Sequence, residues 1–275
     1  EEPLLGGTAD IDLIFIHDAE PVLPREVVGL TDEIHLDIAH LSQDHFQQPR
    51  RLRLDAWLGS YICNHPLVLH DSGHWFDKIQ AIISAQFNQP DNTLNRARAL
   101  AEDARQRWMT LHEGAEGKSP TAVATVYLKA LEQAGNAVAV LNGAPLTERR
   151  FFLLFPQRAQ MLGRPELSAG LVAQLLAAAP QPSAWPAWLP AWKAALQAAG
   201  HQPGCPASLH PARLGYYERA IQALLENTPP AALWLLLRTW TRSAALLPDG
   251  SPEQADWLSA AEVLGLLGSG LQERL

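Results

Sequence analysis

Two aspartates separated by one residue, Asp10 and Asp12, are the side chains near the start of this chain best suited to chemistry. They lie in the stretch GGTADIDLIFIH (residues 6–17), which after the aspartates is dominated by Ile, Leu and Phe. Such a run predicts a β-strand, in which residues i and i+2 share a face. We therefore expect both carboxylates on one face of the strand. The opposite face is expected to be buried and carries Ile11, Leu13 and Phe15.

A third carboxylate, Asp37, stands in the middle of a second predicted strand, EIHLDIAHL (residues 33–41). Neighbouring carboxylates repel each other unless solvent or a cation compensates their charge, and Mg2+ prefers oxygen ligands. Three carboxylates that converge from two strands can hold two Mg2+ ions for phosphoryl-type transfer. One ion then activates an attacking hydroxyl and the other stabilises the leaving pyrophosphate. The residues alone leave a second interpretation open, in which the Asp-x-Asp pair only caps a loop.

Composition limits the classes of function. The hydrophobic residues make up 47% of the 275 residues and the charged ones 18%, as in a folded globular protein. A formal net charge of -8 disfavours extended nucleic-acid binding, which depends on clustered Lys and Arg, and favours a small-molecule or protein substrate. Cys63 and Cys205 are too few and too far apart for a metal motif or a disulfide framework. No membrane span or leader is recognisable, so we expect a cytoplasmic protein without membrane partners.

The hydrophobic pattern changes near residue 90. Before that point it predicts strands at 10–17 and 33–41 and, between them, a connection at 19–31 with room for a short helix. It then predicts a helix at 51–63 and an apolar run compatible with a strand at 66–70. From residue 75 the period is 3.6 almost to the end. We expect helices at 75–87, 92–113, 119–141, 147–155, 167–179, 185–199, 211–226, 231–247 and 253–267.

The predicted fold is therefore α+β, with a mixed-sheet domain at residues 1–90 and an all-helical bundle domain at residues 91–275. Six of the nine tryptophans follow residue 180, on helices whose other large residues are mostly Leu. Two interpretations apply to them, the core of a helical bundle and an aromatic ligand pocket. The bundle core is favoured, because large rings at helical spacing bury extensive apolar area.

The acidic stretches carry a resemblance. GGTADIDLI (residues 6–14), followed by HLDI (residues 35–38), resembles the active-site core of the DNA polymerase beta-like nucleotidyltransferase superfamily. The resemblance is to the small-substrate branch that includes kanamycin and other aminoglycoside nucleotidyltransferases. PLVLHD (residues 66–71), with the helix at 75–87, resembles the short strand and helix that follow the third acid there. The specific match covers about the first 90 residues, and an all-helical second domain is also usual in that branch.

The resemblance implies roles for individual residues. Asp10 and Asp12 become ligands of two Mg2+ ions, and Asp37 becomes the third carboxylate, which holds the catalytic ion and steers the proton of the attacking group. The implied enzyme transfers a nucleoside monophosphate from an NTP, usually ATP, to a hydroxyl-bearing acceptor and releases pyrophosphate. Thr8 and Lys129 are the further candidates for nucleotide contacts, Lys129 because the helical domain closes over the nucleotide in related enzymes.

One part of the family pattern is missing. The family carries a Gly-Ser turn about ten residues before the Asp-x-Asp pair, which holds the phosphates of the donor. Gly6 is too close to Asp10 to supply it, and Gly59 follows the third acid. We expect an N-terminally truncated core, with the turn in a segment preceding Glu1.

Two other functions stay open. A catalytically inactive relative would serve as a nucleotide-binding or protein-interaction module, such as the antitoxin half of a pair. A metal-dependent hydrolase would use the same acids, and His35 shares a face with Asp37, although no histidine spacing matches a known zinc pattern.

Overall fold

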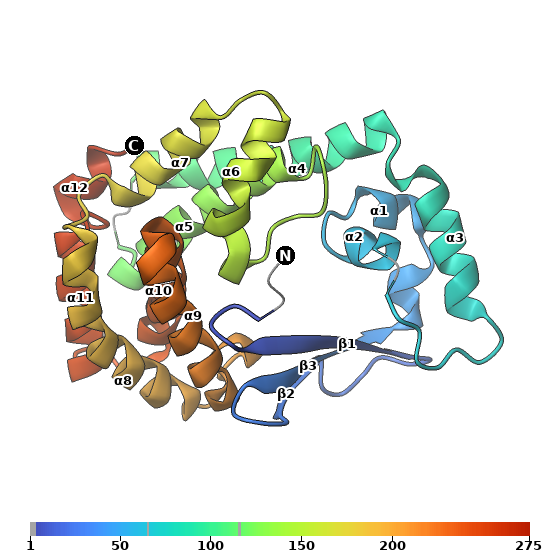
Figure 1. The fold of residues 1–275 in the computed structure, drawn as a ribbon, viewed down its shortest axis with the longest axis horizontal. Helices are drawn as coiled ribbons and strands as arrows, with labels where there is room; N and C mark the ends of the chain where they lie inside the picture. Colours follow the sequence, from blue (N-terminus) through green and yellow to red (C-terminus); the bar gives the residue numbers. More distant parts are fainter. Residues whose placement is uncertain (1–3, 65, 115–116) are drawn as a thin grey trace.

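The computed structural model describes residues 4–64, 66–114 and 117–275 and has an α+β fold, as the sequence predicts. Residues 1–3, at the start of the predicted first domain, lie outside this part. A small sheet and three helices form one side of the molecule, and most of the remaining helices form the other (Figure 1). The described residues form three strands in the order β1-β3-β2: β1 (Ala9–His17), β2 (Arg25–Gly29) and β3 (Ile34–Ser42).

Strand β2 was not predicted, because residues 19–31 were expected to form a connection with room for a short helix. In the structure, Arg25–Gly29 pairs antiparallel with β3, and Val27 lies opposite Asp37. The sequence REVVG contains two adjacent β-branched residues and follows Pro24, so an extended strand suits it better than a helix. Strands β1 and β3 agree with the prediction and pair in parallel.

The apolar face of β1 is not buried as expected. Ile11 is 44% exposed and Phe15 is 50% exposed, and Val28 on the same face of the sheet is 41% exposed. The helices pack instead on the face that carries the aspartates, where Ile16 and Leu41 contact a small apolar core. The prediction was wrong because strand periodicity separates two faces without showing which of them the rest of the chain covers.

Short helices follow the sheet and enclose that small core. Its five residues are each at most 5% exposed: Phe46, Leu52, Ile62, Ile83 and Phe87. The elements are η1 (Gln43–Phe46), α1 (Pro49–Leu54), α2 (Leu58–Cys63) and α3 (Trp75–Phe87). The predicted helix at 51–63 is thus two helices, because the carboxylate of Asp55 accepts hydrogen bonds from the backbone N–H groups of Trp57 and Leu58 and starts a new helix there.

The apolar run at residues 66–70 is irregular rather than a strand. Leu67 is 84% exposed and Leu69 is 75% exposed, so neither contributes to a core. A short apolar run forms a strand when a neighbouring strand satisfies its backbone groups. No strand of the described residues pairs with this segment.

The predicted helices of the second part are present. Ser119 caps one of them by accepting a hydrogen bond from the backbone N–H of Ala122, as the Ser-Pro pair indicates. The α-helices are α4 (Pro90–His112), α5 (Pro120–Ala139), α6 (Phe151–Met161), α7 (Glu166–Leu176), α8 (Leu189–Gly200), α9 (Leu214–Asn227), α10 (Pro229–Leu246), α11 (Pro252–Val263) and α12 (Gly268–Gln272). Short turns of 3-10 helix are η2 (Glu148–Arg150), η3 (Pro182–Trp188), η4 (Ala207–Leu209) and η5 (Pro211–Arg213).

The helical part has one large apolar core. Five tryptophans have less than 2% of their surface exposed: Trp185, Trp192, Trp234, Trp240 and Trp257. The bundle-core interpretation of the tryptophans is confirmed for these five. Among the residues that the structure describes, no helix combines the length and apolar character needed to cross a membrane.

The sheet and the helical part are packed together. Leu5, just before β1, is 7% exposed and belongs to the large helical core. Ala56 packs with residues of α4 and α5 in a third small cluster. Helix α4 starts beside α3 and extends toward the helical side (Figure 1). The chain before β1 is therefore fixed against helices that follow it by more than a hundred residues.

Candidate functional site

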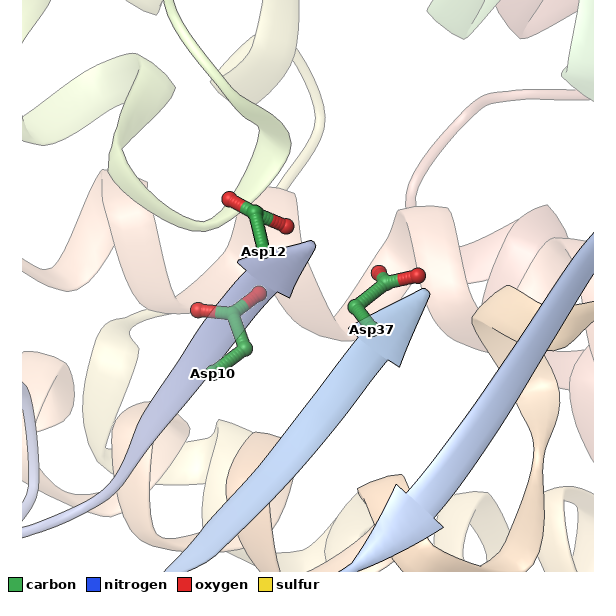
Figure 2. A group of neighbouring side chains, drawn as sticks. All are labelled: Asp10, Asp12 and Asp37. Carbon is green, nitrogen blue, oxygen red and sulfur yellow. The ribbon is translucent and has the colours of Figure 1, made fainter. Parts of the chain in front are cut away.

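The three predicted aspartates come together on one face of the sheet. Asp12 on β1 and Asp37 on β3 are directly opposite each other in the parallel register, and Asp10 lies two residues before Asp12. Figure 2 shows all three side chains on the same side of the two strands. One carboxylate oxygen of each lies within 4.8 Å of one from each of the others. The predicted convergence is confirmed, and metal binding stays a prediction.

The donor set suits a hard cation. Mg2+ binds oxygen at about 2.0 to 2.1 Å, so two ligands of one ion lie about 2.9 Å apart at right angles and about 4.2 Å apart when opposite. The three oxygens, within 4.8 Å of one another, are spaced close to that range. Asp37 is buried (3% exposed), Asp10 is half-buried and Asp12 is exposed, so the group has a rigid inner end and an end open to solution.

Asp37 is paired with two arginines that the sequence analysis did not identify. Arg25 on β2 donates from Nε to Oδ1 and from a terminal nitrogen to Oδ2, both at 2.6 Å. Arg213, at the end of η5, forms a second ion pair with Oδ2. The Arg25 side chain is 53% exposed, and that of Arg213 is 8% exposed. Asp37 therefore has one solvent-facing and one buried cationic partner, and Arg213 joins the sheet to the helical part.

The charged groups around Asp12 shift its pKa in opposite directions. Burial of part of its carboxylate raises the pKa of Asp12 above its ordinary value although the residue is open to solvent, and the charge of Asp10 raises it further. Arg25 and Arg213 act in the opposite direction. Burial, followed by the charge of Asp12, also raises the pKa of Tyr61 on α2. A cation bound at the aspartates would relieve the repulsion that raises the pKa of Asp12.

His35 lies beside the aspartates on the same face of the sheet. It is opposite Asp10 in the register of β3 and β1, and it is 1% exposed. Its ring packs edge-on against Tyr216 of α9, with 4.8 Å between the ring centroids. The Nε2 atom is buried without a hydrogen-bond partner in the described residues. Burial, together with the charge of Arg213, lowers the pKa of His35 to about 4, so the ring is neutral at pH 7.

This pKa predicts a loss of stability in mild acid. Protonation of His35 is easier in the unfolded chain, with a pKa of 6.5, than in the folded protein, with a pKa of about 4. Its contribution to stability is therefore complete above pH 6.5 and falls as the pH drops toward 4. A His35→Gln variant lacks the titrating ring. When the pH falls from about 7 to about 4.5, we expect the free energy of unfolding to drop by about 2 kcal/mol less in this variant than in the parent. Urea unfolding at each pH measures the difference, and equal losses in both proteins would contradict it.

Thr8, a predicted nucleotide contact, is 0% exposed. Its hydroxyl donates to the carbonyl oxygen of Leu5 at 3.1 Å and accepts from a terminal nitrogen of Arg149 at 2.6 Å. Arg149, in η2, also donates to the carbonyl oxygen of Thr8 at 3.1 Å, and its guanidinium lies 3.7 Å from the ring centroid of Tyr216. In this structure the Thr8 hydroxyl therefore fixes the turn that leads into β1, and a nucleotide contact through it stays a prediction.

Lys129, the other predicted nucleotide contact, is on α5. Its ammonium group forms an ion pair with Glu132 at 2.9 Å, and its side chain is 31% exposed. Glu132 also pairs with Arg238 of α10 at 2.8 Å. Lys129 thus belongs to a charged network inside the helical part, and its contact with a nucleotide stays a prediction.

The residues that the sequence analysis missed lack a local signal. Arg25 lies in the strand that was not predicted, and Arg149, Arg213 and Tyr216 follow Asp10 by well over a hundred residues. If β2 had been recognised, Arg25 could have been placed on the aspartate face. Arg25 and Val27 are two residues apart and so share a face of β2, and Val27 lies opposite Asp37. No spacing rule identifies the other three.

Comparison of the chain with models of protein families, with curated proteins and with solved structures gave no match. The resemblance to nucleotidyltransferases therefore depends on the sequence motifs alone.

Proposed function

We propose that this protein is a Mg2+-dependent nucleotidyltransferase, which transfers a nucleoside monophosphate from an NTP to a hydroxyl-bearing acceptor. The observation that supports the proposal is the convergence of Asp10, Asp12 and Asp37 from two parallel strands, with carboxylate oxygens within 4.8 Å of one another. ATP is the donor that the resemblance favours. Mg2+ at these carboxylates would supply Lewis-acid activation of the acceptor hydroxyl and neutralise the charge of the leaving pyrophosphate.

The side chains of this site have separable roles in such a reaction. Asp10 and Asp12 provide oxygens at the solvent-facing end, where a nucleotide can reach them. Asp37 is buried and held by its arginine partners, and in the proposed reaction it would hold the catalytic ion and steer the proton of the acceptor hydroxyl. The guanidiniums of Arg25 and Arg213 lie close enough to this carboxylate to meet phosphate oxygens, for which arginine provides paired donors.

A second candidate is the catalytically inactive nucleotide-binding or protein-interaction module. The ion pairs of Asp37 with Arg25 and Arg213 favour it, because they already neutralise the third carboxylate. An inactive relative can keep the aspartates for folding while the arginines replace the metal as their partners. The two candidates differ in whether a nucleotidylated product forms and, for a module that binds no nucleotide, also in whether divalent cations bind.

Incubation of the protein with labelled ATP, Mg2+ and a panel of hydroxyl-bearing small molecules and proteins tests the proposal. Release of pyrophosphate with a nucleotidylated product supports the transferase. Release of inorganic phosphate without a nucleotidylated product points to the hydrolase and contradicts it. Binding of Mn2+ should be measured on the same preparation, because a protein that binds neither Mn2+ nor ATP–Mg2+ contradicts the transferase independently of the choice of acceptor.

A further inference from the structure

The carboxylate of Asp37 has little capacity left for a metal ion. A carboxylate offers about four lone-pair positions, two on each oxygen. Arg25 uses one position on Oδ1 and one on Oδ2, and Arg213 engages Oδ2 as well. One position on Oδ1 remains, but a cation there would lie beside two guanidiniums that repel it, so tight binding at Asp37 requires at least part of this pairing to give way. Asp10 and Asp12 have no such pairing with arginine among the ion pairs of the described residues.

A displaced guanidinium needs another anion. Arg213 is 7% exposed, and its Nε is buried without a hydrogen-bond partner in the described part of the chain, so moving it away from Asp37 without a new partner leaves a buried charge uncompensated. A complex of a metal ion with a polyphosphate meets both requirements. Its cation binds the carboxylates, and its phosphate oxygens accept hydrogen bonds from the displaced guanidiniums. A free divalent cation binds the carboxylates but provides no anion for the guanidiniums.

We propose that Arg25 and Arg213 form an anion subsite that exchanges partners. They hold Asp37 in the cation-free protein and pass to the phosphate oxygens of a metal-bound polyphosphate, which frees Asp37 for the cation. The two arginines thereby make the site select a cation that arrives with a polyphosphate over a cation that arrives alone. This inference rests on the proposed function, because it requires a cation at the three aspartates.

The test compares two affinities in the same proteins. Binding of Mn2+ alone is measured by the loss of the free-Mn2+ electron paramagnetic resonance signal, and binding of Mn2+–tripolyphosphate by titration calorimetry. Arg25→Gln is the main variant, because Arg25 is 53% exposed and Asp37 keeps Arg213 as a partner when Arg25 is replaced. Arg213→Gln is used as a second variant once circular dichroism shows native helix content. Arg219→Gln is the matched control, because Arg219 also joins a helix to the sheet region, through Glu33 at 3.2 Å, without contacting Asp37.

The proposal predicts affinities that change in opposite directions. Arg25→Gln should bind Mn2+ alone about two- to fivefold more tightly, the range expected for removing one partly exposed ion pair. It should bind Mn2+–tripolyphosphate about three- to tenfold more weakly, since a bidentate phosphate contact is lost. The control variant should change neither affinity by more than about twofold.

Two results would overturn the inference, and they are distinguishable. If Arg25→Gln leaves both affinities unchanged, or moves them in the same direction, while the parent protein binds Mn2+, the exchange is wrong and the metal site stands. If neither the parent nor any variant binds Mn2+ in either form, the proposed function fails together with the exchange.

Discussion

Replacing Asp12 by asparagine is expected to abolish nucleotidyl transfer and to weaken Mn2+ binding by roughly 100-fold or more, since even the groups that support a metal ligand contribute 10- to 100-fold. Asparagine has the same shape as aspartate but no charge, and Asp12 is exposed, so the fold should be unaffected. The physical reason is that Asp12 lies opposite Asp37 and offers an oxygen within 4.8 Å of those of the other two acids, so a cation held by the three acids would lose a charged ligand. Electron paramagnetic resonance of Mn2+ and pyrophosphate release measure the two effects separately.

Asp18→Asn provides the control for Asp12→Asn. Asp18 directly follows β1, is exposed and accepts a hydrogen bond from Gln43 at 2.7 Å, which an asparagine oxygen can also accept. It removes the same charge from the same region without touching the three acids, so Mn2+ binding should remain. Equal Mn2+ affinities for Asp12→Asn and the parent protein would show that the aspartates are not the metal site and would leave the inactive module as the better proposal.

Substitution of Arg238 by alanine is expected to lower the free energy of unfolding by about 3 to 5 kcal/mol, the cost of breaking a buried ion pair by removing one partner. Arg238 on α10 donates to Glu132 at 2.8 Å and to Glu148 at 3.1 Å, and its side chain is 9% exposed. Burial lowers the pKa of Arg238, and the charge of Glu132 opposes that shift. Without the guanidinium, the buried carboxylate of Glu132 keeps only Lys129 as an ionic partner. Urea unfolding followed by circular dichroism measures the change.

Arg105→Ala is the matched comparison for Arg238→Ala. Arg105 also forms an arginine–glutamate pair, with Glu102 at 2.7 Å, but both side chains are exposed. Water screens such a pair, so its removal should leave the free energy of unfolding nearly unchanged. A similar small effect for Arg238→Ala would mean that the network does not hold the bundle together and that its charges are available for another role, such as the nucleotide contact predicted for Lys129.

Metal-binding measurements on Asp12 and on Arg25 variants together separate the transferase from an inactive module that binds no cation. A transferase must bind a cation at the aspartates, whereas an inactive module can keep Asp37 permanently paired with Arg25 and Arg213. If Arg25→Gln binds Mn2+ and the parent protein does so only in the presence of tripolyphosphate, the arginines control access of the cation. That outcome would show how Asp37 can be paired with arginines in the cation-free protein and still belong to a catalytic site.

Local patterns in the sequence were sufficient to place Asp10 and Asp12 on one face of a strand and Asp37 in the middle of another. The period of two assigns Asp10 and Asp12 to the same side of β1, and apolar alternation near each acid identifies the strands. That Asp37 joins them was expected from the resemblance and depends on the parallel pairing of β1 with β3. The helices after residue 75 were equally predictable, because a period of 3.6 and caps such as Ser119 depend on residues only a few positions apart. These features follow from short-range geometry, and the structure agrees with them.

The tertiary structure decided what surrounds the aspartates. Only the folded chain shows that helices cover the aspartate face and leave Ile11 and Phe15 exposed on the other. It also brings Arg213 to Asp37 and Arg149 to Thr8, across more than a hundred residues of sequence. The sequence by itself thus determined which strands carry the acids and that Asp10 and Asp12 share a face, since strand geometry is local. Their charge partners depend on how distant helices pack against the sheet, and no local spacing records that packing.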